Sequence, residues 1–291
     1  MRHVYQCPLR WADLDPLQHV NNVKYLDYLQ DARVDFLRTI APGLRADAAS
    51  DAVEALVVVA HDITYAAPLA LHRSVDVECW ISEVKAATFT ISYEIVTRVG
   101  EQRVVHASAS TVLTPFVFAE QRPRRLAAEE RALLKGWIEN PTPSTPLPPM
   151  RPHLTPAGHY DLNVRFSDVD AYGHVNNVTF LEYLQEGRIA FTAELRNQLE
   201  PQDRTSVVVA RTRIEYVRQM HHRVEPYAVV SWIESIGNRS MVVESEIRDG
   251  DVVHARASVV LVFFDPETQR SAAPSAAMRA LVESRVAPAG R

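Results

Sequence analysis

The sequence contains two copies of the same stretch, and this duplication restricts the possible folds more than any other feature. Residues 11–33 read WADLDPLQHVNNVKYLDYLQDAR and residues 166–188 read FSDVDAYGHVNNVTFLEYLQEGR, with 12 of 23 positions identical at an offset of 155. Weaker matches follow in the same order, at offsets that drift to 148, as loops of different length would produce. We therefore predict domain 1 at residues 1–139, a stiff proline-rich linker at 140–158 and domain 2 at 159–291.

Each copy is predicted to hold a long helix followed by four strands of an antiparallel meander, with the sheet wrapped over the helix. This makes the fold class α+β. In the first copy Val23, Leu26 and Leu29 begin an apolar stripe at steps of three and four, which is typical of a helix face. The strands are rich in Val, Ile, Thr and aromatic residues. The expected strands are 3–10, 55–65, 73–84, 88–98 and 103–115, then 159–166, 206–216, 223–236, 240–248 and 252–264. The expected helices are 20–38, 126–138, 175–198 and 275–286.

Composition and charge exclude several classes of protein. The net charge of the chain is −5, and neither half is basic, so a nucleic-acid partner is not expected. No apolar run approaches the roughly 18 residues of a membrane span, and the segment MRHVYQCPLR lacks the apolar core of a signal peptide. The chain has only two cysteines, Cys7 and Cys79, and no CxxC pair, which argues against a disulfide framework and a cysteine zinc site. We expect a cytoplasmic protein without membrane insertion.

A dense group of polar residues precedes the long helix of each copy, in the pattern Asp-x-Asp-x-x-x-His-Val-Asn-Asn. The first turn of a helix leaves backbone N–H groups unpaired and carries partial positive charge, so it can hold an oxyanion. An ionised Asp beside it can act as a general base on water or as a nucleophile on an acyl carbon. The pattern therefore indicates acyl transfer without metal or serine. The candidate catalytic residues are Asp15, His19, Asp170 and His174. The candidate oxyanion or capping residues are Asn21, Asn22, Asn176 and Asn177.

Simpler roles compete with this interpretation. Asn at a helix start is often only a cap, and Asp before it often only closes a turn, so Asp13 and Asp168 are expected to be structural. Capping does not require an imidazole at a fixed spacing in both copies, which favours chemistry for Asp15 and His19. A metal site at these two residues is not expected, because His-x-x-x-His spacing is absent, and no cofactor is predicted.

Several other polar residues are secondary candidates for the site. Asp31 and Glu186 can assist from the helix, but pairing with Arg33 or Arg188 is the more common role. His106 and His254 match on a strand and read as half-buried structural residues. His221 and His222 have no counterpart in the first copy and read as a surface turn. Arg122, Arg124 and Arg125 can meet CoA phosphates or form a solvated charge run.

With these residues in view, the segment WADLDPLQHVNNVKYLDYL and its repeat resemble the motif of hotdog-fold thioesterases. The similarity is to the 4-hydroxybenzoyl-CoA thioesterase type and to the fatty acyl-ACP thioesterases, which are double hotdogs. The resemblance implies two tandem hotdog domains that pair within the chain as a pseudo-dimer. It also implies that Asp15 and Asp170 are the catalytic carboxylates. In the acyl-ACP branch the His of HVNN is a catalytic partner, which corresponds to His19 and His174.

The resemblance has departures that bear on the substrate. The acyl-ACP branch has an Asn two residues before the His, where this chain has Leu17 and Tyr172. This disfavours acyl-ACP as substrate. The copies also differ from each other, since Gly173 precedes one His and Gln18 the other. If one site is degenerate, the second copy is expected to be the intact one.

These observations favour a thioesterase that hydrolyses an acyl-CoA, with the acyl chain lying between helix and sheet. Two alternatives remain open at this level. One is a hotdog enoyl-CoA hydratase or dehydratase, which also uses an Asp and a His a few residues apart. The other is an acyl-CoA-binding module without activity. Further association of the pseudo-dimer into a homo-oligomer is also left open.

Overall fold

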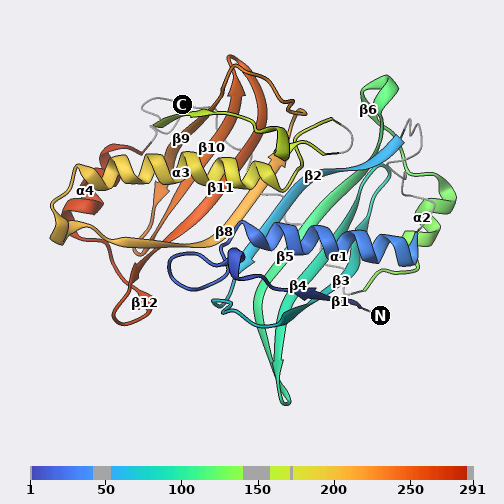
Figure 1. The fold of residues 1–291 in the computed structure, drawn as a ribbon, viewed down its shortest axis with the longest axis horizontal. Helices are drawn as coiled ribbons and strands as arrows, with labels where there is room; N and C mark the ends of the chain where they lie inside the picture. The colour runs from blue at the N-terminus through green and yellow to red at the C-terminus, as the bar shows by residue number, and fades with distance from the viewer. Residues whose placement is uncertain (1, 42–53, 140–157, 171–172, 287–291) are drawn as a thin grey trace. The chain divides into compact units, whose positions relative to one another are not determined.

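The computed structural model describes residues 2–41, 54–139, 158–170 and 173–286 (Figure 1). The chain divides into two compact units, Met1–Leu147 and Pro148–Arg291. The predicted linker lies outside the described residues, except that Gly158 already begins a strand. The pairing of the two units as a pseudo-dimer stays a prediction.

The first unit consists of an antiparallel sheet with a long helix, α1, against one face (Figure 1). The order of its strands is β1-β3-β4-β5-β2, with the short β6 beside β5. Helix α1 contacts β1 and β3, and the shorter helix α2 contacts β3. The strands are β1 (His3–Pro8), β2 (Glu54–Tyr65), β3 (Ser74–Val84), β4 (Phe89–Val99), β5 (Gln102–Val117) and β6 (Arg122–Pro123). The helices are α1 (Lys24–Ile40) and α2 (Ala128–Lys135), and two 3-10 turns are η1 (Trp11–Asp13) and η3 (Phe118–Glu120).

The second unit repeats this arrangement, with strand order β7-β9-β10-β11-β8 and β12 beside β11. Its long helix α3 contacts β7, β9 and β10, and α4 contacts β9. The strands are β7 (Gly158–Leu162), β8 (Ser206–Tyr216), β9 (Tyr227–Ile236), β10 (Ser240–Asp249), β11 (Val252–Asp265) and β12 (Arg270–Ser271). The helices are α3 (Thr179–Asn197) and α4 (Ala276–Ser284), and the 3-10 turns are η4 (Phe166–Asp168) and η5 (Pro201–Asp203).

The predicted meander is wrong for one strand of each copy. Strand β2 pairs with β5, and β8 pairs with β11, although β3 and β9 come next in the chain. The connection after β2 is not a hairpin, because its backbone bonds elsewhere: the amide of Ala66 donates to the carbonyl of His106, and the carbonyl of Leu69 accepts from Val20. The chain therefore crosses past β5 and β4 before β3 begins, between β1 and β4.

Both long helices begin four residues later than predicted, at Lys24 instead of residue 20 and at Thr179 instead of residue 175. The reason is that Val20 and Val175 belong to short β-bridges with Leu14 and Val169. The apolar stripe of α1 faces the core as expected, with Leu26, Leu29 and Ala32 among its fully buried residues. Within the described ranges, no helix is both long and apolar enough to cross a membrane.

Candidate functional site

The polar motif of the first copy folds into a small hairpin that sits ahead of α1. The amide of Asp15 donates to the carbonyl of His19 at 2.8 Å, and the amide of Asn21 donates to the carbonyl of Asp13 at 2.8 Å. Leu14 and Val20 form the bridge between these pairs. Side chains of directly opposed residues share a face of an antiparallel ladder. The spacing of the motif therefore places Asp15 beside His19 on one face, while Val20 is buried on the other.

The second copy repeats the hairpin bond for bond. The amide of Asp170 donates to the carbonyl of His174 at 2.8 Å, and that of Asn176 donates to Asp168 at 2.9 Å. Val169 and Val175 form the bridge. Tyr172, at the tip of this hairpin, lies outside the described residues, so the predicted departure at that position has no structural account.

The first Asp of each copy is structural, as expected. Asp13 Oδ2 accepts from the amide of Arg10 at 2.8 Å and from the hydroxyl of Tyr28 at 2.8 Å. Burial and this bond to the carboxylate raise the pKa of Tyr28. In the second copy Asp168 Oδ2 accepts from Arg165 and from the hydroxyl of Tyr183 in the same way. The tyrosine ties the hairpin to the long helix.

The second Asp of each copy is half-buried and is oriented by backbone amides. Asp15 Oδ1 accepts from Leu17 N at 2.8 Å and from His19 N at 3.2 Å, and Asp170 Oδ1 accepts from His174 N at 3.3 Å. These bonds fix the direction in which each carboxylate points. The turn uses Oδ1, which leaves Oδ2 of Asp15 as the oxygen that can face a reactant.

The histidines of the motif are also half-buried, and the second has a neighbour that the first lacks. The ring of His174 lies 4.9 Å from the ring of His221, centroid to centroid, and His221 Nδ1 is 3.4 Å from the carbonyl of Gly173. Burial, and then the neighbouring His221, lower the pKa of His174, while Asp170 opposes the shift. His221 and His222 are exposed, which agrees with the predicted surface turn, but the contact with His174 was not predicted.

The paired asparagines bond locally at the helix starts. Asn21 Oδ1 accepts from Val23 N at 3.3 Å, and Asn176 Oδ1 accepts from Val178 N at 3.4 Å, so each asparagine closes a turn just ahead of its helix. The N-cap residues themselves are Val23 and Val178, and among the described residues neither helix start has a side-chain capping bond. The backbone carbonyls of Asn22 and Asn177 accept from two tyrosine hydroxyls, as described next. The prediction that the catalytic Asp lies at the helix N-terminus needs correction, because Asp15 lies in the hairpin before α1 rather than in its first turn.

Two further pairs of matching residues support the site, and the sequence reasoning assigned them no role. Tyr65 Oη donates to the carbonyl of Asn22 at 2.9 Å, and Tyr216 Oη donates to that of Asn177 at 2.8 Å. These tyrosines end the matched segments VVVAHDITY and VVARTRIEY, so their repetition was the available signal. The other pair consists of the tyrosines that bind Asp13 and Asp168.

The secondary candidates on the helices have other surroundings than expected. Asp31 is exposed while Arg33 is buried, and among the described residues no ion pair joins them. Partial desolvation of the Asp31 carboxyl by its neighbours raises its pKa, although the residue is exposed overall. Glu186 is likewise exposed while Arg188 is buried. The predicted pairing along the helix is therefore wrong for Asp31, because the two residues lie on different faces.

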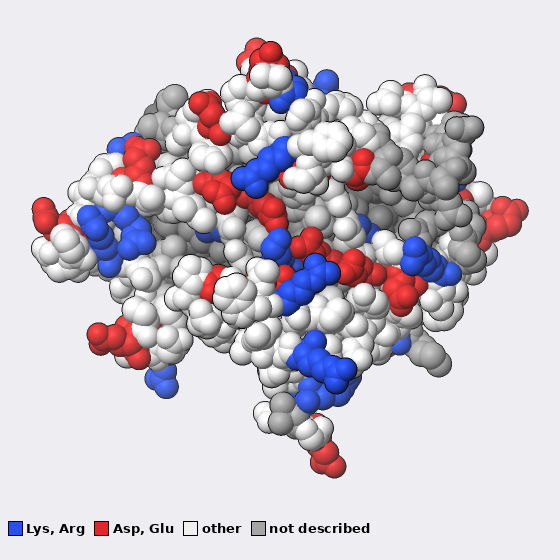
Figure 2. Space-filling model, viewed as in Figure 1, with Lys and Arg blue, Asp and Glu red and all other residues white. Residues whose placement is uncertain are grey.

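Two of the three arginines proposed as ligands for CoA phosphates form ion pairs with glutamates of the same unit. Arg124 binds Glu54 at 2.7 Å and Glu130 at 2.8 Å, and Arg122 pairs with Glu120. On the face drawn in Figure 2, basic and acidic groups are interspersed. No group of three or more His, Cys, Asp or Glu is placed to hold a metal within the part of the chain that the structure describes.

Comparisons with known proteins give the site its context. A family profile described as the thioesterase-like superfamily matches residues 9–154 and 164–282. A protein of Lactobacillus plantarum described as an oleoyl thioesterase shares 14% identity and a TM-score of 0.74, covering 91% of this chain and 97% of its own. A 12:0-ACP thioesterase from Umbellularia californica shares 14% identity and a TM-score of 0.72, covering 89% and 93%. These similarities show a shared fold, the tandem hotdog.

A further match is shorter. The uncharacterized protein YsmA of Bacillus subtilis is 41% identical over 59 residues, which are 20% of this chain and 40% of that protein. The chain thus matches less than half the length of this curated relative.

Proposed function

Because the chain belongs to the thioesterase-like superfamily, we propose that it hydrolyses an acyl-CoA to a free acid and CoA. The observation that carries the proposal is the hairpin that sets Asp15 opposite His19 and Asp170 opposite His174, with the same bonds in both copies. A carboxylate and an imidazole on one face, half-exposed to solvent, are the groups that thioester hydrolysis needs.

In the proposed reaction Asp15 or Asp170 either removes a proton from the attacking water or attacks the thioester carbon itself. In the second case an acyl-Asp anhydride forms, and water then hydrolyses it to the free acid and restores the carboxylate. The electron pair of the C–S bond leaves with the thiolate, which takes up a proton as CoA departs. His19 and His174 orient the reactants or donate that proton. The first turns of α1 and α3 would hold the carbonyl oxygen, because the helix macrodipole is positive there. The acyl chain would lie between helix and sheet.

The choice of acyl-CoA over acyl-ACP rests on Leu17, which occupies the position of the Asn that the acyl-ACP branch carries. One structural neighbour is named as an acyl-ACP thioesterase. At 14% identity, the substrate of that neighbour does not indicate the substrate of this chain. The carrier-protein substrate is therefore an outcome that the experiment must be able to reveal.

The test is thiol release from a panel of acyl-CoAs, from short to long and from aliphatic to aromatic, and from acyl-ACPs with the same acyl chains, followed with a chromogenic thiol reagent. Release from the acyl-ACPs alone would show a carrier-protein substrate. Cys7 and Cys79 are buried, and burial raises the pKa of Cys7 to about 12, so the protein's own thiols add little background. We expect release that peaks at one chain type. An enoyl-CoA that loses its absorbance without thiol release would instead show a hydratase. Binding without turnover would show a binding module.

A further inference from the structure

In each copy a strand histidine holds the loop that lies against the site hairpin. His106 on β5 is 6% exposed, and His254 on β11 is 9% exposed. The Nδ1 atom of His106 lies 2.9 Å from the carbonyl of Pro68, and that of His254 lies 2.8 Å from the carbonyl of Gln219. A carbonyl only accepts, so Nδ1 carries the proton and donates it. Thr97 then donates to Nε2 of His106, at 2.8 Å, which agrees with this tautomer.

The backbone of the same histidines holds the start of the loop. The carbonyl of His106 accepts from Ala66 N at 2.8 Å and from Ala67 N at 3.2 Å. In the second copy the corresponding donors are Val217 and Arg218, at 2.8 and 3.0 Å. Each loop is therefore attached to its histidine by two backbone bonds and by one bond from the ring.

The far side of each loop reaches the site. The carbonyl of Leu69 accepts from Val20 N at 2.8 Å, and that of Met220 accepts from Val175 N at 2.9 Å. Leu69 and Met220 are both fully buried, at 0% exposure, so these contacts are anchored in the core. Each valine directly follows the candidate catalytic histidine, which places the strand histidine one loop away from it.

We propose that His106 and His254 are positioning residues, which fix the catalytic histidine of their own copy relative to its Asp by holding this loop. The inference rests on the function proposed above. The two loops differ in sequence, Pro-Leu-Ala against Gln-Met-His, because the histidine reads only their backbone carbonyls. The histidine itself is the same in both copies. Burial lowers the pKa of both rings, which keeps them neutral and able to bond in this way.

Two near-isosteric substitutions separate this role from general packing. The amide nitrogen of Asn can occupy the position of Nδ1 and keep the bond to the loop, whereas that of Gln corresponds to Nε2 and loses it. In an Asp15→Asn background only the second copy can turn over. There we expect His254→Asn to keep most of the rate and His254→Gln to lower kcat at least about tenfold, with a smaller change in KM.

The control uses the other copy. In an Asp170→Asn background, where the first copy works alone, His254→Gln is expected to leave the rate unchanged, and the His106 variants give the mirror-image experiment. A merely structural histidine would lower the rate of both copies, or would respond equally to Asn and Gln. Either result overturns the proposal.

A second readout does not depend on turnover. The ring resonance of His174, followed by NMR, is expected to move in His254→Gln and to stay close to its wild-type position in His254→Asn. If the wild-type protein releases no thiol from any substrate, the proposed function fails while this measurement still decides the positioning role. A His174 resonance that is the same in both variants would overturn it.

Discussion

The left-handed residue at the hairpin tip is the smallest difference between the two copies. Gln18 has φ of 63° and Gly173 has φ of 79°, so both occupy the same conformation. A side chain costs about 1–2 kcal/mol there, and Gly avoids this cost. The expectation that the second copy is the intact site stays a prediction, and the structure adds that Gln18 carries a backbone strain that Gly173 does not.

We therefore expect opposite effects of exchanging these residues. Gly173→Ala should lower the free energy of unfolding by about 1 kcal/mol, because no atom within 4 Å of the added Cβ would clash and only the backbone strain remains. Gln18→Gly should raise it by about 0.5 kcal/mol, since the relief is offset by a more flexible unfolded chain. Urea unfolding measures both. Equal signs for the two changes would contradict this interpretation.

The contact between His174 and His221 is a second difference at the scale of single residues. Removing the neighbour, which shields His174 and repels its charged form, should raise the pKa of His174 toward its usual range. We expect this rise in the pKa of His174 in the variant His221→Ala. Alanine is the residue at the equivalent position of the first copy, Ala70. NMR titration of the His174 ring measures the change.

The matched control is His222→Leu, which introduces the equivalent Leu71. The ring of His222 faces Phe166, at 6.1 Å between centroids, and not His174. Its substitution should leave the His174 titration in place. An unchanged midpoint in His221→Ala, or an equal rise in both variants, would refute the role of His221.

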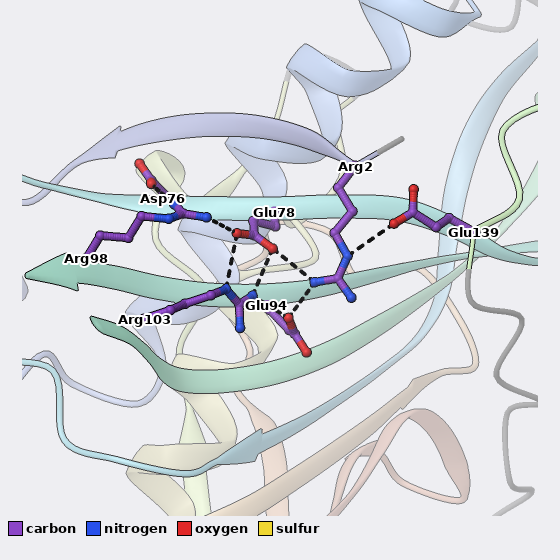
Figure 3. Close-up of polar contacts among 7 residues, drawn as sticks. All are labelled: Arg2, Asp76, Glu78, Glu94, Arg98, Arg103 and Glu139. Atoms are coloured by element: carbon purple, nitrogen blue, oxygen red, sulfur yellow. Dashed lines mark hydrogen bonds and ion pairs between the residues drawn. The ribbon is translucent and has the colours of Figure 1, made fainter. Parts of the chain in front are cut away.

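The sheet of the first unit carries an ion cluster on β3, β4 and β5, which Arg2 joins from just before β1 (Figure 3). Glu78 and Glu94 lie directly opposite each other on β3 and β4, which alone would be unfavourable. Arg2 binds Glu78 at 2.9 Å and Glu94 at 2.5 Å, and Arg103 binds Glu78 at 2.8 Å. Arg98 joins Glu78 to Asp76. The arginines convert a repulsive pair into cross-links between strands.

Glu78→Gln should therefore destabilise the protein by about 1–2 kcal/mol at pH 7, after allowance for solvent around the arginines. Burial opposes ionisation, but the bonds from Arg103, Arg2 and Arg98 prevail and lower the pKa of Glu78 to about 2. A carboxyl with a lowered pKa adds stability above its unfolded value, near 4.5, and loses it as the pH falls toward 2. The gap in free energy of unfolding between wild type and variant should shrink over that window.

Asp76→Asn serves as the comparison, because Asp76 binds only the more exposed Arg98 among the described residues. Denaturant unfolding at pH 7 should show a smaller loss for it than for Glu78→Gln. A gap for Glu78→Gln that persists unchanged at pH 2 would contradict the assignment.

Local sequence patterns predicted most helices and strands, but they did not predict which strands pair with each other. The apolar steps from Leu26 onward and the Val-rich strands indicated the helix and strands, because these periodicities are properties of a few consecutive residues. The start of α1 was missed because Val20 fits the helical stripe equally well, and only its bridge to Leu14 and the bond of its amide to Leu69 show that it precedes the helix. The place of β2 beside β5 likewise depends on pairing between residues far apart in the chain.

The candidate site stays a prediction, and what the structure adds is the local geometry of its residues. Repetition singled out Asp15 and His19, and the hairpin register explains their spacing. The support from Tyr65 and from His106 was not foreseen, because each acts through a backbone carbonyl whose identity leaves no trace in the sequence. The only sequence signal for these two residues was that Tyr216 and His254 occupy the matching positions of the second copy.

At the scale of the whole molecule, the duplication provides two copies of one design in a single chain. The same bonds recur around Asp15 and Asp170, from the tyrosine that ties down the hairpin to the histidine that holds its loop. Under the proposed function, we therefore expect that each copy can be inactivated alone while the other serves as an internal reference. A further homo-oligomer stays a prediction.

The most direct test of the proposed function compares thiol release by wild type, Asp15→Asn, Asp170→Asn and the double variant, on the acyl-CoA that the panel selects. Circular dichroism and urea unfolding establish that each variant is folded. We predict that the double variant loses turnover by at least about 100-fold. Each single variant should keep only the part of the wild-type rate that its unchanged copy contributes, so the two single-variant rates should add up to the wild-type rate. A folded double variant that keeps the wild-type rate would contradict the role assigned to the two carboxylates.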